Sequence, residues 1–262
     1  MTEPAIDVEH LTVSYGPVPA LLDVSFSVPP GTLVGVIGPN GSGKSTLIKT
    51  ILGFLKPDVG QVRVFGQPTD RIKGSVAYVP QRSAVDWDFP VTVREVALMG
   101  RYGKVPWYRS LSPEDYAAAE EALRRVRMQQ LADRQIGQLS GGQQQRVFMA
   151  RAMAQGAQVL LLDEPFAGVD AATESAILDV LRETKAAGRT LVVVHHDLAT
   201  AAEYFDRLLL LKQRVYAYGE PREVLRADLL TQVYEGRLRV FAQVLEGGDA
   251  EERGDEGERA DR

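Results

Sequence analysis

The 262-residue sequence contains no cysteine. This absence excludes disulfide bonds, thiolate zinc sites and a cysteine nucleophile. No run of about 18 apolar residues occurs, so a membrane process would need another chain to supply the span. Basic residues are the minority, with 30 Lys and Arg against 35 Asp and Glu, for a net charge of −5. Nucleic-acid binders usually show a basic excess, so we expect no nucleic acid among the partners.

Short apolar runs alternate with segments that have helical character. The runs Thr32–Ile37 and Val159–Leu162 are typical of strands buried on both faces of a sheet. Predicted helices follow them at Lys44–Leu52 and Ala172–Ala186. This alternation predicts an α/β fold with a mostly parallel sheet flanked by helices. Apolar and polar residues alternate around Val24–Val28, and we expect an N-terminal antiparallel β subdomain there.

The middle and the end of the chain differ from this pattern. Residues of about 91–155 contain helical segments and no convincing strand, which predicts a helical subdomain inserted into the core. We therefore expect residues 1–245 to form one domain. Residues 246–262 are mostly Gly, Glu, Asp and Arg, and this composition predicts a disordered acidic tail.

A glycine-rich loop lies between the first buried strand and its helix. Residues 38–45 match G-x-x-x-x-G-K-[ST], the loop of a P-loop NTPase core. Glycines let the backbone N–H groups wrap phosphate oxygens, and the helix adds the positive end of its dipole. Lys44 is predicted to contact the β- and γ-phosphates, and the Ser45 hydroxyl to bind Mg²⁺. The predicted nucleotide-binding residues of this segment are Gly38, Asn40, Gly41, Ser42, Gly43, Lys44, Ser45 and Thr46.

Two acids end the second buried strand. Burying an unpaired charge is costly, so Asp163 and Glu164 are unlikely to serve packing alone. Asp163 is predicted to bind Mg²⁺, directly or through water. Glu164 is predicted to polarise the attacking water, and general-base help of this kind typically contributes about 10²–10⁴ in rate.

The segment Leu139–Gln143, with the sequence Leu-Ser-Gly-Gly-Gln, closely resembles the signature of ABC-transporter ATPases. The resemblance covers about residues 5–225. It implies that ATP and Mg²⁺ are the cofactors and that Tyr15 stacks on adenine. It also implies that Gln81 senses Mg²⁺ and water, and that His196 is the switch histidine. Further residues that the resemblance assigns to nucleotide contact or to subunit communication are Ser140, Gly141, Gly142, Gln143 and Asp170.

The same family implies a set of partners. The signature of one copy would contact the ATP held by the phosphate loop of a second copy, so a homodimer is expected. Integral membrane permease subunits and an extracytoplasmic substrate-binding protein would complete the system. The chain itself would be peripheral, on the cytoplasmic face of the cell membrane. The segments Ser83–Val93 and Met99–Gly103 and the run His195–Leu198 are similar to ATPases of the manganese, zinc and iron-chelate uptake group.

Some alternatives stay open at this point. Trp87 and Phe89 are candidate anchors for the permease, but Trp87 could instead pack within the helical subdomain. A soluble ABC ATPase with a role outside transport is the second candidate function. A nucleotide-binding regulator without turnover is the third, although an intact Glu164 argues against it.

Overall fold

The computed structural model describes residues 3–72 and 74–234. The predicted acidic tail, 246–262, lies outside the described residues, as does the end of the predicted domain, 235–245. Within the described ranges, no helix combines the length and the apolar composition needed to cross a bilayer.

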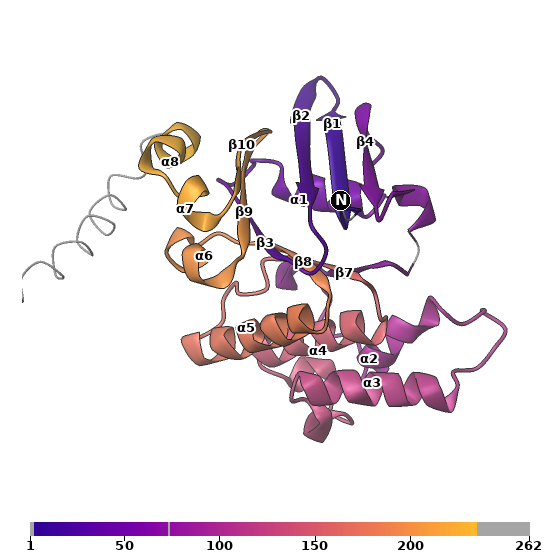
Figure 1. Ribbon diagram of the computed structural model, residues 1–262. Helices are drawn as coiled ribbons and strands as arrows, with labels where there is room; N and C mark the ends of the chain where they lie inside the picture. Colours follow the sequence, from indigo (N-terminus) through magenta and orange to yellow (C-terminus); the bar gives the residue numbers. More distant parts are fainter. Residues whose placement is uncertain (1–2, 73, 235–262) are drawn as a thin grey trace, which may run out of the picture.

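Two β-sheets form the upper part of the molecule (Figure 1). The first has the strand order β2-β1-β4-β5, and its pairs are antiparallel. The second has the order β10-β9-β3-β8-β7-β6; only its β10–β9 pair is antiparallel. The strands are β1 (Ile6–Tyr15), β2 (Val18–Val28), β3 (Leu33–Ile37), β4 (Val59–Val64), β5 (Gln67–Pro68), β6 (Val76–Val79), β7 (Val159–Asp163), β8 (Thr190–Val194), β9 (Arg207–Lys212) and β10 (Arg214–Gly219).

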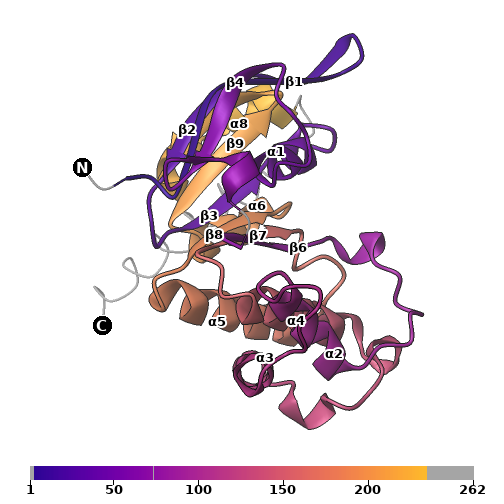
Figure 2. The ribbon, with the colours of Figure 1, turned by 90° about the vertical axis from the view of Figure 1, so that its right-hand side faces the viewer.

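The central sheet separates two hydrophobic cores, because side chains alternate between the faces of a strand. In β3, Leu33 and Ile37 belong to the core beneath the sheet, whereas Val34 and Val36 belong to the core shared with the antiparallel sheet and α1. Figure 2 shows the same order of layers, with the antiparallel sheet and α1 above the central strands and the helices α2, α3, α4 and α5 below them.

The helical subdomain packs under the sheet through α2, α3 and α4. Its helices begin at well-formed capping boxes: Thr92 with Glu95, Ser112 with Asp115 and Ser140 with Gln143. The helices of the described chain are α1 (Lys44–Ile51), α2 (Val93–Tyr102), α3 (Pro113–Arg125), α4 (Gly141–Ala154), α5 (Ala171–Ala186), α6 (Leu198–Tyr204), α7 (Pro221–Val224) and α8 (Ala227–Tyr234).

The predicted fold class is confirmed: a mostly parallel sheet flanked by helices, an antiparallel N-terminal sheet, and a helical segment between β6 and β7. Three elements near the end of the described chain, β10, α7 and α8, were not predicted. Within the stretch predicted to be helical, about 91–155, the first helix is α2, which begins at Val93 after the Thr92 cap and runs to Tyr102.

Candidate nucleotide and catalytic site

The candidate site lies at one edge of the central sheet. The phosphate loop follows β3, Glu164 follows β7 and His196 follows shortly after β8, while Gln81 follows β6. These four strands are parallel neighbours, so their carboxyl ends meet at the same edge. In open α/β sheets this edge is where ligands bind.

The phosphate loop depends on glycines at two positions for steric reasons. Gly43 caps α1 with a φ of 100°, and a Cβ there would lie 2.6 Å from the Ala20 carbonyl oxygen. Gly38 has a φ of 153°, and its Cβ would overlap the Leu211 carbonyl oxygen. Gly41, by contrast, faces open space. The loop is therefore held closely against β2 and β9 while its outer side stays accessible.

Lys44 folds back over this loop. Its ammonium donates to the carbonyl oxygens of Gly38 at 2.8 Å and Pro39 at 3.0 Å. Burial lowers the pKa of Lys44, and the nearby carboxylates of Glu164 and Asp163 oppose that shift. The side chain is thus a largely desolvated cation at the start of a helix, where it is placed to meet phosphate charge.

Asp163 is a buried carboxyl group beside a tyrosine. Burial, followed by the charge of Glu164, raises the pKa of Asp163, while Lys44 lowers it. Burial and the charge of Asp163 together raise the pKa of Tyr78 to about 12. Because burial makes the ionised form of this carboxyl group costly, a cation bound beside it would stabilise that ionised form. The Asp163 carboxylate, the Ser45 hydroxyl and the Gln81 amide each offer oxygen, the kind of ligand that Mg²⁺ prefers.

Glu164 is held in place by Gln81. The Gln81 amide nitrogen donates to the Glu164 carboxylate at 2.7 Å. Glu164 also adopts a φ of 50°, a left-handed conformation that is uncommon for a residue with a side chain. Such local strain clusters at functional sites. Its position after β7 and the hydrogen bond from Gln81 together direct the Glu164 carboxylate toward a pocket that it lines with the phosphate loop. We call this pocket the nucleotide pocket.

The nucleotide pocket has a volume of about 440 Å³ and is lined mainly by the phosphate loop. Tyr15 lines it too and is 54% exposed, so this ring is available for stacking and is not part of the core. None of the lining residues belongs to the signature segment 140–143. The lining residues are Tyr15, Ala20, Asn40, Gly41, Ser42, Gly43, Lys44, Ser45, Thr46 and Glu164.

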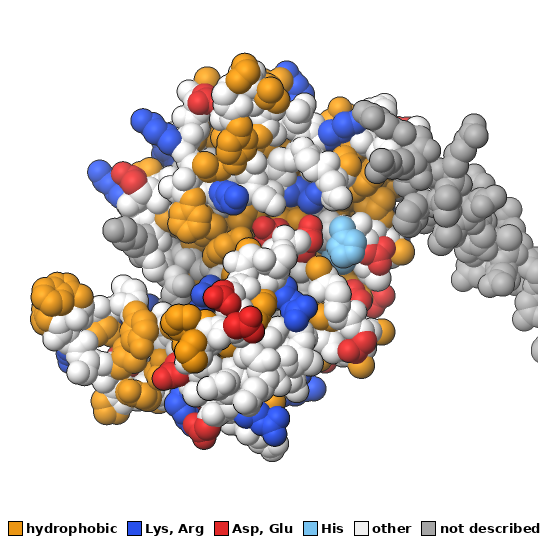
Figure 3. All heavy atoms as spheres, turned by 180° about the vertical axis from the view of Figure 1, so that it is seen from behind, with side chains coloured by type: hydrophobic (Ala, Val, Ile, Leu, Met, Phe, Trp, Pro, Cys, Tyr) orange, Lys and Arg blue, Asp and Glu red, His pale blue; other side chains and the backbone are white. Residues whose placement is uncertain are grey.

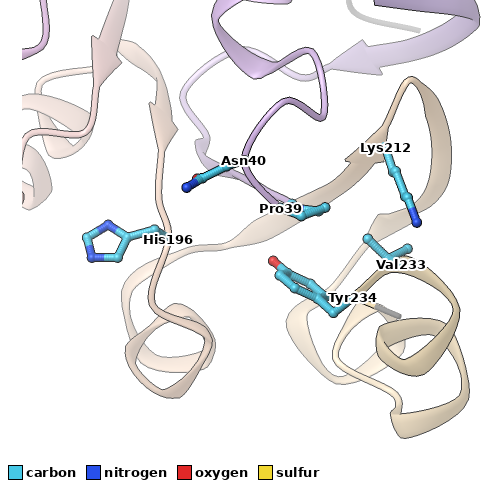
Figure 4. A pocket seen from close by; sticks show the side chains of 7 residues that line it. Pro39, Asn40, His196, Lys212, Val233 and Tyr234 are labelled. Atoms are coloured by element: carbon cyan, nitrogen blue, oxygen red, sulfur yellow. The ribbon is translucent and has the colours of Figure 1, made fainter. Parts of the chain in front are cut away.

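A second cavity adjoins the other side of the phosphate loop. Asn40 and the exposed His196 both line it (Figure 4). Tyr234, at the end of α8, points its hydroxyl toward the loop segment of Pro39 and Asn40, as Figure 4 shows. The structure thus brings His196 beside the phosphate loop, and it adds a C-terminal helix that the sequence did not predict.

His195 differs from its neighbour in being buried, with 1% of its surface exposed. Its Nε2 lies 2.9 Å from the Thr200 hydroxyl, and its ring packs edge-on against Phe166 and Phe205. Burial lowers the pKa of His195 to about 4. This histidine is a neutral core residue at neutral pH, whereas the exposed His196 lines the cavity beside the phosphate loop.

The signature segment begins α4. The Ser140 hydroxyl accepts from the Gln143 backbone N–H, and the Gln143 side chain accepts from the Ser140 backbone N–H at 3.0 Å. Gly142 is buried against α5, where an added Cβ would overlap Thr173. Asp170 caps α5 by accepting from the Thr173 backbone N–H at 2.9 Å and from its hydroxyl at 3.0 Å. The signature, and the loop of Asp170, therefore sit at two adjacent helix N-termini.

Sequence reasoning missed two residues that connect these parts. The Arg82 guanidinium donates to the buried Gln144 side chain at 3.1 Å, and Gln144 donates to the Ile136 carbonyl oxygen at 3.2 Å. Arg82 directly follows Gln81, so one short segment is bonded to both Glu164 and the signature helix. A glutamine inside an otherwise apolar helix face was the available signal, because a buried amide needs partners.

Trp87 packs within the helical subdomain, the alternative that the sequence had left open. Its ring lies edge-on to Phe148 with centroids 5.2 Å apart, and its indole N–H donates to the Arg82 carbonyl oxygen at 2.9 Å. Phe89 is 57% exposed and remains a candidate contact for a partner.

Comparisons with known proteins agree with this geometry. Residues 21–167 match the family model described as ABC transporter. The chain is 52% identical to the zinc transport system ATP-binding protein TroB of Treponema pallidum, over 89% of this chain and 88% of TroB. It is 50% identical to the manganese transport system ATP-binding protein MntB of Bacillus subtilis, over 89% and 93%.

The same relationship is visible in solved structures. The ADP conformation of MJ1267, an ATP-binding cassette of an ABC transporter, superimposes with a TM-score of 0.78 at 30% identity, covering 89% of this chain and 99% of that one. The chain is also 44% identical to the chelated iron transport system membrane protein YfeB of Yersinia pestis, over 90% of this chain and 81% of YfeB. The resemblance to the manganese, zinc and iron-chelate group is confirmed by these three relatives. The chain belongs to the ABC transporter family, as one of its ATP-binding and ATP-hydrolysing cassettes.

Proposed function

We propose that this chain drives uptake of a transition-metal ion, manganese or zinc or chelated iron, through a separate membrane permease. The proposal rests on sequence identity. The chain is 52% identical to a cassette named for zinc transport and 50% identical to one named for manganese transport, along 88% and 93% of their lengths. A soluble role outside transport remains the alternative, and no feature of the described chain favours it over transport.

The catalytic cycle that we propose requires two copies. The nucleotide pocket receives no residue of the chain's own signature, although Ser140–Gln143 presents backbone N–H groups at a helix start, where an anion is stabilised. Two copies facing each other would combine both halves around each ATP. ATP then favours the closed dimer because only that state completes the site.

Within each ATP site, each residue has a separate proposed role. Lys44 and the loop N–H groups bind the phosphates, and Ser45, Asp163 and Gln81 are the proposed Mg²⁺ ligands. Mg²⁺ would supply neutralisation of the charge that develops on the phosphates. Glu164 orients and deprotonates the attacking water, Gln81 fixes the Glu164 carboxylate, and His196 contacts the terminal phosphate.

The proposed permease contact is a groove between the core and the helical subdomain. Its volume is about 690 Å³. Phe54, 69% exposed, and Met99, 38% exposed, are apolar side chains on its two sides. Tyr78, beside the buried Asp163, also lines it. A partner seated there would lie close to the segment that carries Gln81. An extracytoplasmic binding protein would complete the system, with this chain at the cytoplasmic face of the membrane.

The function is tested by co-expressing the chain with a metal permease from the same source and measuring ATP-driven uptake of Mn²⁺, Zn²⁺ and chelated iron into vesicles. The expected result is uptake of at least one of them that Glu164→Gln abolishes. If the purified chain recovers ribosomes or DNA and no polytopic membrane protein, the soluble alternative is correct.

A further inference from the structure

The segment between α2 and α3 exposes two aromatic side chains at its tip. Trp107 is 95% exposed and Tyr108 is 75% exposed, and among the residues that the structure describes these are the two most exposed large apolar side chains. Figure 3 shows hydrophobic side chains gathered on the part of the helical subdomain that projects farthest, at the lower left. An indole left almost wholly in water offers a large apolar surface to a partner.

The tip is an ordered turn. The Arg109 backbone N–H donates to the Pro106 carbonyl oxygen at 2.9 Å, which makes Trp107 and Tyr108 the two central residues of a β-turn. Their rings meet edge to face with centroids 5.9 Å apart. The base is fixed by Arg101, whose guanidinium donates to Asp115 and to the Ala154 carbonyl oxygen, both at 2.8 Å. The aromatic pair is therefore presented outward by a supported loop.

The loop itself carries positive charge, unlike the chain as a whole. Residues 101–112 contain Arg101, Lys104 and Arg109 and no acidic residue, whereas the chain carries a net charge of −5. Glu114 and Asp115 follow at the start of α3, and Asp115 pairs with Arg101, so Lys104 and Arg109 are the cations of the loop that this ion pair leaves. Lys104 and Arg109 are exposed beside the aromatic tip. Trp and Tyr with flanking Lys and Arg form the combination that favours the headgroup region of a bilayer, because the rings enter the interface and the cations face anionic lipid.

The loop also adjoins the groove that we assign to the permease. The Lys104 ammonium lies 3.0 Å from the position that a Cβ on Gly156 would occupy. Gln155, the residue before Gly156, lines the groove. A cassette docked through that groove would hold the loop on the side of the molecule nearest its membrane partner.

We propose that the loop of residues 103–110 binds the surface of an anionic lipid bilayer. Trp107 and Tyr108 enter the interfacial region, while Lys104 and Arg109 face the lipid phosphates. The inference rests on the proposed function, since a cassette attached to a permease works beside a bilayer. The contact is weak alone and would add to the permease contact by raising the local concentration of the cassette at the membrane.

The experiment uses the full chain without permease and vesicles of phosphatidylcholine, either pure or with about one third phosphatidylglycerol. In a Trp87→Phe background Trp107 is the only tryptophan, since the chain has two. We expect its emission to shift to the blue, and to be quenched by brominated acyl chains, with the anionic vesicles only. Co-sedimentation should weaken about fivefold for each of Lys104→Gln and Arg109→Gln and should fall with salt.

The control makes changes of the same kinds, an aromatic residue to Ala and an Arg to Gln, at positions away from the loop. Tyr216 is 39% exposed on β10 and Arg222 is exposed on α7, far from the loop in Figure 1. Tyr216→Ala with Arg222→Gln should leave vesicle binding unchanged, whereas Trp107→Ala with Tyr108→Ala should abolish it. The loop variants and the control variant should keep the circular dichroism spectrum of their parent, because the side chains substituted in them are exposed.

Two outcomes would overturn the inference. One is wild-type binding to anionic vesicles that the loop variants do not reduce. The other is no vesicle binding by the wild type, together with loss of permease co-purification in Trp107→Ala; this would assign the loop to the permease. In that second case metal uptake by the wild-type complex would continue, so the failure would be separate from a failure of the proposed function.

Discussion

A single methyl group at Gly142 is expected to destabilise the fold through a contact with Thr173. A Cβ at position 142 would overlap Thr173 Cγ2, while Thr173 Cβ and Oγ1 are each 3.2 Å away. Overpacking of this kind costs about 1–3 kcal/mol. Replacing glycine by alanine in a helix returns at most about 1 kcal/mol. We therefore expect Gly142→Ala to lower the free energy of unfolding by about 1–2 kcal/mol.

The contact can be isolated by a double-mutant cycle measured by urea unfolding of the nucleotide-free chain. Thr173→Ser removes Cγ2 and keeps the hydroxyl that bonds Asp170 at 3.0 Å. In that background Gly142→Ala should be close to neutral, a coupling of about 1–2 kcal/mol. Gly141→Ala is the control, because its Cβ would meet only the flexible end of Arg82, 3.1 Å away. Equal costs of Gly142→Ala in both backgrounds would refute the packing explanation.

Three further predictions concern the site and its surroundings. Glu164→Gln should reduce ATP turnover about 10²–10⁴-fold and should trap an ATP-bound dimer on size exclusion; a variant that stays monomeric with saturating Mg-ATP would contradict the composite site. Lys44→Ala should abolish nucleotide binding measured by calorimetry, because it removes the desolvated cation over the loop, and an unchanged affinity would disprove its assigned role. His195 has a pKa of about 4 in the folded chain against 6.5 as the ordinary value, so the unfolded chain binds more protons between these pH values. Its contribution to stability should be intact above pH 6.5 and lost as the pH falls toward 4, by at most about 3 kcal/mol. In His195→Gln the difference in unfolding free energy from the wild type should therefore shrink on acidification, and a difference that is constant with pH would show that folding does not lower the pKa of His195.

The predictable part of the structure is the part with strong local signals. The buried strands predicted at Thr32–Ile37 and Val159–Leu162 are β3 and β7, each of which matches the prediction to within one residue. Every residue of both strands is buried, and this produces the apolar runs in the sequence. The helix predicted at Ala172–Ala186 is α5, which begins directly after Asp170, whose side chain accepts from the Thr173 backbone N–H at 2.9 Å. The phosphate loop could be predicted for a similar reason, because the spacing of its glycines follows from local backbone geometry.

The missed parts depend on contacts between segments that are distant in the sequence. The strand β10 pairs only with β9 at the edge of its sheet, and its residues are mostly part-exposed, so no apolar run marks it. The pairing of Arg82 with Gln144 joins residues 62 positions apart. The burial of Trp87 against Phe148 could not be separated from an interface role, because exposed and packed tryptophans give the same sequence pattern.

The contacts of Gln81 and Arg82 suggest how the groove and the two half-sites are linked. Gln81 donates a hydrogen bond to Glu164, the carboxylate that we propose to act on the chain's own ATP. Arg82, the next residue, bonds Gln144 in the helix whose start would serve the ATP of the other copy. A partner in the groove that moved the helical subdomain against the core would have to stretch one of these bonds or carry the segment along. Because a buried amide left without a partner costs about 1–3 kcal/mol, moving the segment with Gln144 is the cheaper response, and it draws Gln81 away from Glu164. Hydrolysis and the position of the signature would then change together through two adjacent residues.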